Sequence, residues 1–136
     1  MNNPISLKQA VYLSGIATSL FKFIFEKAKH ECSIDLNNLI TLASDINQEV
    51  HNALLKYTPA PLSLRLLNCL NNKRTISLDL AMHRAKLGTS LYEIILEQAS
   101  PTNIQACSTE LHNMLSLACD INQEVYHALV AVVYIE

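Results

Sequence analysis

The sequence has few glycines, no tryptophan and few charged side chains. Gly15 and Gly88 are its only glycines, so the chain lacks the glycine-rich loop that holds a phosphate in nucleotide-binding proteins. Charged residues make up 16% of the 136 residues and the net charge is −2. Both values are too low for a general binder of phosphate backbones. We therefore expect no nucleic-acid partner.

Metal-binding and export signals are also missing. The four cysteines, at positions 32, 69, 107 and 119, lie far apart and form no C-x-x-C pair, which argues against a zinc or redox site. We expect them to be reduced and mostly buried. The start MNNPISLKQ has no basic segment followed by an apolar one, and no apolar run approaches the length of a membrane span. These absences predict a soluble, cytoplasmic protein without a membrane partner.

An internal repeat is the main positive feature. Residues 5–28 match residues 76–99 at 10 of 24 positions, and residues 32–57 match residues 107–132 at 14 of 26. The second match has a larger offset than the first, so a short insertion lies between the matched segments of the second copy, at SPTNIQA (100–106). Insertions are tolerated in loops, so each repeat should have a loop near its middle. We interpret the chain as a tandem duplication.

Apolar residues recur every three or four positions on both sides of that loop, which predicts helices. Each repeat is then a helical hairpin, and two hairpins pack most simply as an antiparallel four-helix bundle. We predict an all-α single domain over 1–136, with repeat one at about 5–57, repeat two at about 76–134, and a linker (58–75) containing a short helix that caps the bundle. Four serines, Ser6, Ser33, Ser77 and Ser108, suit the helix N-caps.

The hexapeptide DINQEV occurs in both repeats, at 45–50 and 120–125. Its isoleucine and valine fall on the core face, its asparagine at the edge of that face, and its other residues outside. One explanation is a duplication whose surfaces have not diverged. The other is a polar patch used twice to bind a partner, and its candidate residues are Asp45, Gln48, Glu49, Asp120, Gln123 and Glu124.

A metal-dependent enzyme is a weaker hypothesis. Glu124 and His127 have the Glu-x-x-His spacing of di-iron bundles, but the first repeat has Asn52 where the histidine is needed. Both residues also fall on the outer face. A metal site could also combine His83 and Asp79 with Glu124 and His127. These two pairs lie on opposite flanks of their helices, however, and antiparallel neighbours bring like flanks together. No serine or cysteine stands in a recognisable motif that would pair a nucleophile with a general base. We therefore expect no catalytic residue, no metal and no cofactor.

The first helix of each repeat carries apolar residues behind its core stripe. A helix that is apolar on two faces needs a second partner. We expect these residues to form the interface of a homodimer, with another protein as a further candidate partner: Leu13, Ile16, Leu20, Phe23, Leu87, Leu91 and Ile94. The competing explanation is that the linker covers them or that they are scattered surface residues.

The expected function is therefore non-enzymatic: an interaction or regulatory protein that presents helix faces to a protein partner. Charge is uneven, since residues 65–86 carry five basic side chains and one acidic, whereas residues 87–136 carry six acidic and no basic. This indicates either halves that complement each other or an acidic face for a basic partner. The alternative function is a bundle that binds a small ligand in an apolar cavity with a few convergent polar groups.

Overall fold

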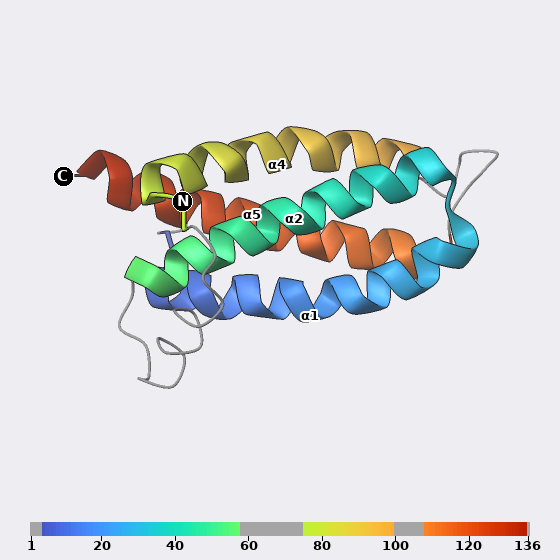
Figure 1. Cartoon of the computed structure of the whole chain (residues 1–136), viewed down its shortest axis with the longest axis horizontal. Helices are drawn as coiled ribbons and strands as arrows, with labels where there is room; N and C mark the ends of the chain where they lie inside the picture. The colour runs from blue at the N-terminus through green and yellow to red at the C-terminus, as the bar shows by residue number, and fades with distance from the viewer. Residues whose placement is uncertain (1–3, 58–74, 100–107, 136) are drawn as a thin grey trace.

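The computed structural model describes residues 4–57, 75–99 and 108–135, which form four α-helices (Figure 1). They are α1 (Leu7–Glu31), α2 (Ile34–Tyr57), α4 (Leu78–Gln98) and α5 (Thr109–Ile135). These three ranges contain no strand, so the all-helical prediction is confirmed. The predicted linker helix lies outside the described residues. None of the described helices combines the length and apolar character required to cross a membrane.

The helices form a bundle in which α1 and α4 each pack against both α2 and α5. α1 and α4 therefore lie across a diagonal, as Figure 1 shows with α1 at the bottom and α4 at the top. Hydrogen bonds join Asn37 to Ala28 and His51 to Ser14, so α2 runs antiparallel to α1. α5 likewise runs back along α4 (Figure 1). Consecutive helices are thus antiparallel neighbours.

The four predicted serine caps are confirmed. Ser6 Oγ accepts a hydrogen bond from the backbone N–H of Gln9, whose side chain in turn accepts one from the Ser6 N–H. Ser33, Ser77 and Ser108 each accept one from the N–H three residues later. Each cap satisfies an N–H group that the first helical turn leaves without a partner. The helix starts are therefore fixed locally, by single residues.

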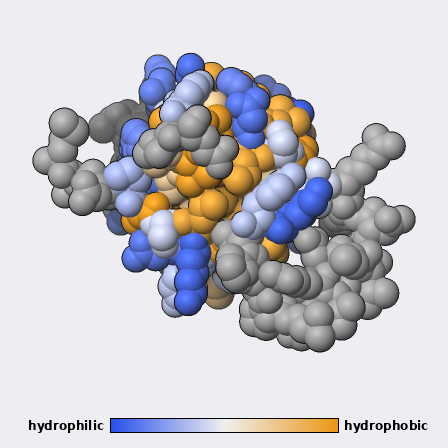
Figure 2. Space-filling view, turned by 90° about the vertical axis from the view of Figure 1, so that its left-hand side faces the viewer, coloured by the Kyte–Doolittle hydropathy of each residue, from blue (hydrophilic) through white to orange (hydrophobic). Residues whose placement is uncertain are grey.

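Small residues allow the helices to approach closely along the core. Alanines are buried on all four helices, and larger side chains such as Phe21, Ile40, Ile95 and Leu115 fill the space between them. Cys119 is also buried, and burial is the main cause that raises the pKa of its thiol. Figure 2 looks onto the end where α1 and α4 begin, and apolar residues gather at its centre.

The asparagine of each DINQEV copy joins two helices. Asn47 Nδ2 donates to the Ser14 carbonyl at 3.2 Å and to Thr18 Oγ1 at 3.0 Å. Asn122 Nδ2 donates to the Ala85 carbonyl at 3.0 Å and to Thr89 Oγ1 at 3.2 Å. The two sets of partners occupy equivalent positions in the two repeats. The same polar contact therefore holds α1 to α2 and α4 to α5.

Gly88 makes room for the second of these contacts. A Cβ atom on Gly88 would lie 3.1 Å from Asn122 Oδ1, closer than an ordinary van der Waals contact. A larger residue there would press on the amide that bridges α4 and α5. This close approach offsets the cost of a glycine inside a helix, which is about 1 kcal/mol relative to alanine.

We predict that Asn47→Ala and Asn122→Ala each lower the free energy of unfolding by about 1–2 kcal/mol, because each removes hydrogen bonds between helices at a half-buried site. Urea denaturation followed by circular dichroism measures the change. Gln123→Ala, next to Asn122 but exposed, is the control and should change it by less than about 0.5 kcal/mol. Equal losses in all three variants would contradict a bridging role for the asparagines.

Candidate docking surfaces

The DINQEV side chains predicted to bind a partner lie outside the core. Asp45, Asp120, Gln123 and Glu124 are exposed, and Gln48 and Glu49 are half-buried. Gln48 donates to Asn52 on its own helix. Ile46 and Val50 are buried, as are their counterparts Ile121 and Val125. The hexapeptide thus combines core residues, a helix-bridging asparagine and surface carboxylates.

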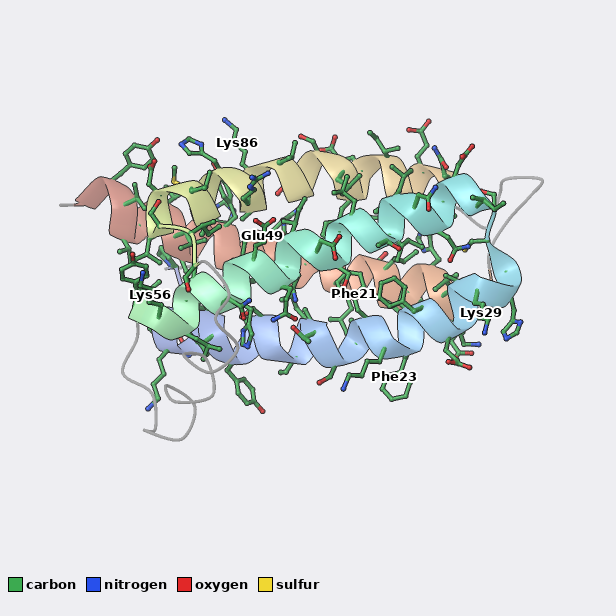
Figure 3. The ribbon with its side chains drawn as sticks, viewed as in Figure 1. Phe21, Phe23, Lys29, Glu49, Lys56 and Lys86 are labelled. Carbon is green, nitrogen blue, oxygen red and sulfur yellow. The ribbon has the colours of Figure 1, made fainter. Side chains whose placement is uncertain are left out.

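The predicted second apolar face of the first helix in each repeat is only partly on the surface. Phe23 is 67% exposed, and Ile16, Leu87 and Ile94 are also exposed. Figure 3 shows Phe23 pointing away from the bundle, whereas Phe21 points into it. Leu13 and Leu20 are half-buried and pack against the core.

The prediction that Leu91 lies on an outward-facing interface is wrong. Only 8% of it is exposed, so it belongs to the core and not to an outward face. The physical reason is that α4 contacts α2 as well as α5, and this second contact covers part of its second apolar face. Periodicity alone does not show how far a second neighbour reaches around a helix.

Exposed residues of α1 and α5 form one surface. Ile16, Phe23 and Lys27 follow one another at helical spacings of seven and four on α1, so they lie on one strip. On α5, Glu110 and Leu117 have the spacing of seven, and the next strip members are Asp120 and Glu124. Lys27 Nζ lies 3.1 Å from Glu110 Oε2, which places the two strips side by side. We call the set Ile16, Phe23, Leu117, Asp120 and Glu124 the α1/α5 surface.

The repeat-equivalent positions of α2 and α4, which also pack together, form a second surface. Its residues correspond one for one to those of the α1/α5 surface when the two repeats are aligned. All are exposed except the half-buried Glu49, and Figure 3 shows Glu49 on the side of α2 that is turned toward α4. We call the set Leu42, Asp45, Glu49, Leu87 and Ile94 the α2/α4 surface.

The two surfaces lie on opposite sides of the bundle. In the order in which neighbours pack, α1, α2, α4 and α5 form a closed square, and the α1/α5 and α2/α4 seams are its opposite edges. The apolar faces predicted for one interface are therefore divided between two. The equivalent leucines Leu42 and Leu117 are 48% and 49% exposed, so the exposure itself is repeated.

Arg84 distinguishes the two surfaces. It lies between Leu80 and Leu87 on the α4 strip, where the repeat-equivalent residue of α1 is Leu13. Arg84 is half-buried, and its Nε is shielded from solvent without a hydrogen-bond partner. It takes part in none of the ion pairs formed among the described residues. An incoming acceptor cannot reach the shielded Nε either, but the half-buried guanidinium still carries a charge that no described carboxylate neutralises.

A polar pair that the sequence analysis missed lies between α1 and α2. Ser14 Oγ is 2.7 Å from His51 Nδ1 and 3.0 Å from the Val11 carbonyl oxygen. A hydroxyl has one hydrogen to donate, so Ser14 donates either to the Val11 carbonyl or to His51, and the tautomer of the ring decides which. The two residues are far apart in the sequence, and Ala85 and Tyr126 replace them in the second repeat, so no repeated motif marks the pair.

This Ser–His pair does not have the geometry of a nucleophile and its base. Ser14 is fully buried at 0% exposure, so a substrate has no access to its oxygen. Its oxygen is also within hydrogen-bond distance of a backbone carbonyl of its own helix, so both contacts lie inside the packed interface between α1 and α2. The contact therefore packs α1 against α2. Gly15 leaves room for the ring, since a Cβ there would lie 3.4 Å from His51 Cε1.

The residues considered for a metal do not come together. His83 lies 3.8 Å from Asp79 on its own helix, and both are well exposed. Glu124 and His127 are exposed on α5. Within residues 4–57, 75–99 and 108–135, no three histidine, cysteine or carboxylate side chains are grouped as metal ligands.

Compared with known proteins, the sequence matches no family model and no curated protein, and the fold matches no solved structure. A function is therefore inferred from the surfaces themselves.

His51 makes stability depend on pH. Burial lowers the pKa of His51 below its ordinary value, because the charged ring loses its hydration between the helices. As the pH falls, the unfolded chain binds this proton first, so the free energy of unfolding falls; above the unfolded-state pKa the contribution is complete. We predict that the free energy of unfolding falls less between about pH 7 and about pH 5 in His51→Gln than in the unmodified protein. Urea denaturation at several pH values measures the free energy of unfolding. An equal pH dependence in the two proteins would contradict this assignment.

Proposed function

We propose that this protein is a non-enzymatic interaction protein that forms a homodimer and presents a helical face to a protein partner. The observation that carries the proposal is the repetition of the exposed residues. Five surface positions on one side of the bundle, three of them apolar, have counterparts on the other side. Exposed apolar residues gathered on a strip lower their free energy when a second surface covers them.

The division into two surfaces suits a protein with two binding partners. A twofold dimer contact uses one patch on each copy, so it leaves the patch on the far side of each bundle accessible. One surface can then hold the second copy while the other holds a different protein. Repetition of the carboxylates on both surfaces supports a shared use in docking, because exposed positions far from contacts tolerate substitution at little cost.

The interior supports packing more than ligand binding. A ligand cavity needs polar groups that converge on an open space. Here the half-buried and buried polar side chains Ser14, Asn47 and His51 bond to one another or to backbone across α1 and α2. They hold the helices together and leave their outer strips to interact.

We predict that the unmodified protein sediments as a dimer at micromolar concentration and that Phe23→Ser/Ile94→Ser is a folded monomer. Each substitution removes an exposed apolar side chain from one of the two surfaces, and a side chain buried in a dimer contributes about 25 cal/mol per Å². Sedimentation velocity measures the association, and thermal melting checks the fold.

Ile34→Ser is the matched control. Ile34 is the most exposed large apolar side chain among the described residues, at 80%, but Thr109 replaces it in the second repeat and it belongs to neither surface. This variant should remain a dimer. A monomeric unmodified protein would contradict the proposed homodimer, and dissociation by Ile34→Ser would show that apolar exposure in general, and not these surfaces, drives association.

A further inference from the structure

Each surface carries one aspartate and one glutamate, but only the α2/α4 surface has an arginine, Arg84, beside it, and this difference selects the one that can bind its own copy. On the α1/α5 surface Asp120 and Glu124 lie on a helix without lysine or arginine. Lys27, at the end of that surface, already pairs with Glu110 and Glu31. Two such surfaces placed together would bring carboxylates from both copies into one contact without a free cation, which costs free energy.

The α2/α4 surface also has two carboxylates, those of Asp45 and Glu49, but the cation Arg84 lies beside them on the α4 strip. Arg84 on α4 has a shielded Nε without a partner, and Glu49 on α2 is half-buried and takes part in none of the ion pairs of the described residues. Around them lie the exposed apolar residues of both helices. Leu80, Leu87 and Ile94 recur at every seventh position on α4, the spacing with which a helix meets another helix along a seam.

Arg84 and Glu49 lie at the same level along the bundle. The contact between Lys27 and Glu110 fixes one level at which α1 and α5 meet. Leu13 precedes Lys27 by as many positions as Glu124 follows Glu110, so these two residues also share a level. Their repeat equivalents are Arg84 and Glu49. Figure 3 agrees, because Glu49 and Lys86, which follows Arg84 closely on α4, appear at nearly the same point along the long axis.

This shared level gives the surface a twofold self-complementarity. A twofold rotation about an axis parallel to the bundle and lying in the contact places α2 of one copy over α4 of the other without shifting either along the axis. Residues at one level then face each other. Glu49 of each copy meets Arg84 of the second copy, and the apolar strips of α2 and α4 meet between them.

We propose that a second copy of this chain docks on the α2/α4 surface, with two reciprocal pairs between Arg84 and Glu49 across the contact. The inference rests on the proposed interaction function and names the partner of this surface. The incoming carboxylate supplies the opposite charge that Arg84 lacks among the described residues of its own chain, and the contact excludes water from both groups. The acidic α1/α5 surface stays outside this contact.

Charge reversal followed by mixing tests the contact. Arg84→Glu and Glu49→Arg should each weaken dimerisation at least tenfold in sedimentation velocity, because each puts like charges together in both pairs. Mixed in equal amounts, the two variants should associate again, since each copy then supplies the charge that the other requires. If Arg84→Glu fails to fold, Arg84→Gln replaces it in the single-variant measurement, and Arg84→Asp replaces it in the mixture.

Glu124→Arg is the matched control, because it makes the repeat-equivalent change on the opposite side of the bundle, and dimerisation should be unaffected. Three results would overturn the inference. Dimers that survive both single reversals, or that dissociate with Glu124→Arg, place the contact elsewhere while leaving the proposed homodimer intact. Restoration in the Arg84→Glu/Glu49→Arg chain but not in the mixture places the pair within one chain. A monomeric unmodified protein would instead contradict the proposed homodimer itself.

Discussion

Each helix of this bundle must pack against two neighbours, and this requirement determines which apolar residues are left on the surface. α1 contacts α2 within its own hairpin and α5 from the other, so its apolar arc has to be wider than a single stripe. Leu13 and Leu20 are covered in part by this second contact, whereas Ile16 and Phe23 lie beyond it. The apolar part of each docking surface consists of residues that neither neighbour covers.

The asparagine bridges set the register of the two helices within each hairpin. A packed seam of alanines and leucines tolerates sliding, but Asn47 and Asn122 each need a carbonyl and a threonine hydroxyl at fixed positions. Sliding α2 along α1 by one turn would remove those partners from a half-buried amide. The placement of α5 beside α1 depends on a different contact, the packing of one hairpin against the other, where Lys27 meets Glu110.

Helices, caps and the repeated core could be predicted from the sequence because they depend on neighbours three or four residues apart. Ser6, Ser33, Ser77 and Ser108 needed only local spacing. The burial of Leu91 and the contact between Ser14 and His51 could not be predicted from the sequence, because each depends on how distant helices are arranged in space. The sequence also did not show that the DINQEV carboxylates of α5 and the exposed apolar residues of α1 share one surface. They do so because α5 packs beside α1. The proposed role of Arg84 likewise depends on the packing, which leaves its side chain half-buried and without an ion pair among the described residues.

Concentration-dependent NMR spectra test the central claim, self-association through a repeated helical surface, most directly. Backbone amide signals recorded over a range of concentrations report which helix faces become covered as copies associate. We predict shifts at Leu42, Glu49, Leu87 and Ile94 on α2 and α4, with Ile16, Phe23 and Leu117 unchanged. Spectra that do not depend on concentration, or shifts confined to α1 and α5, would contradict this claim.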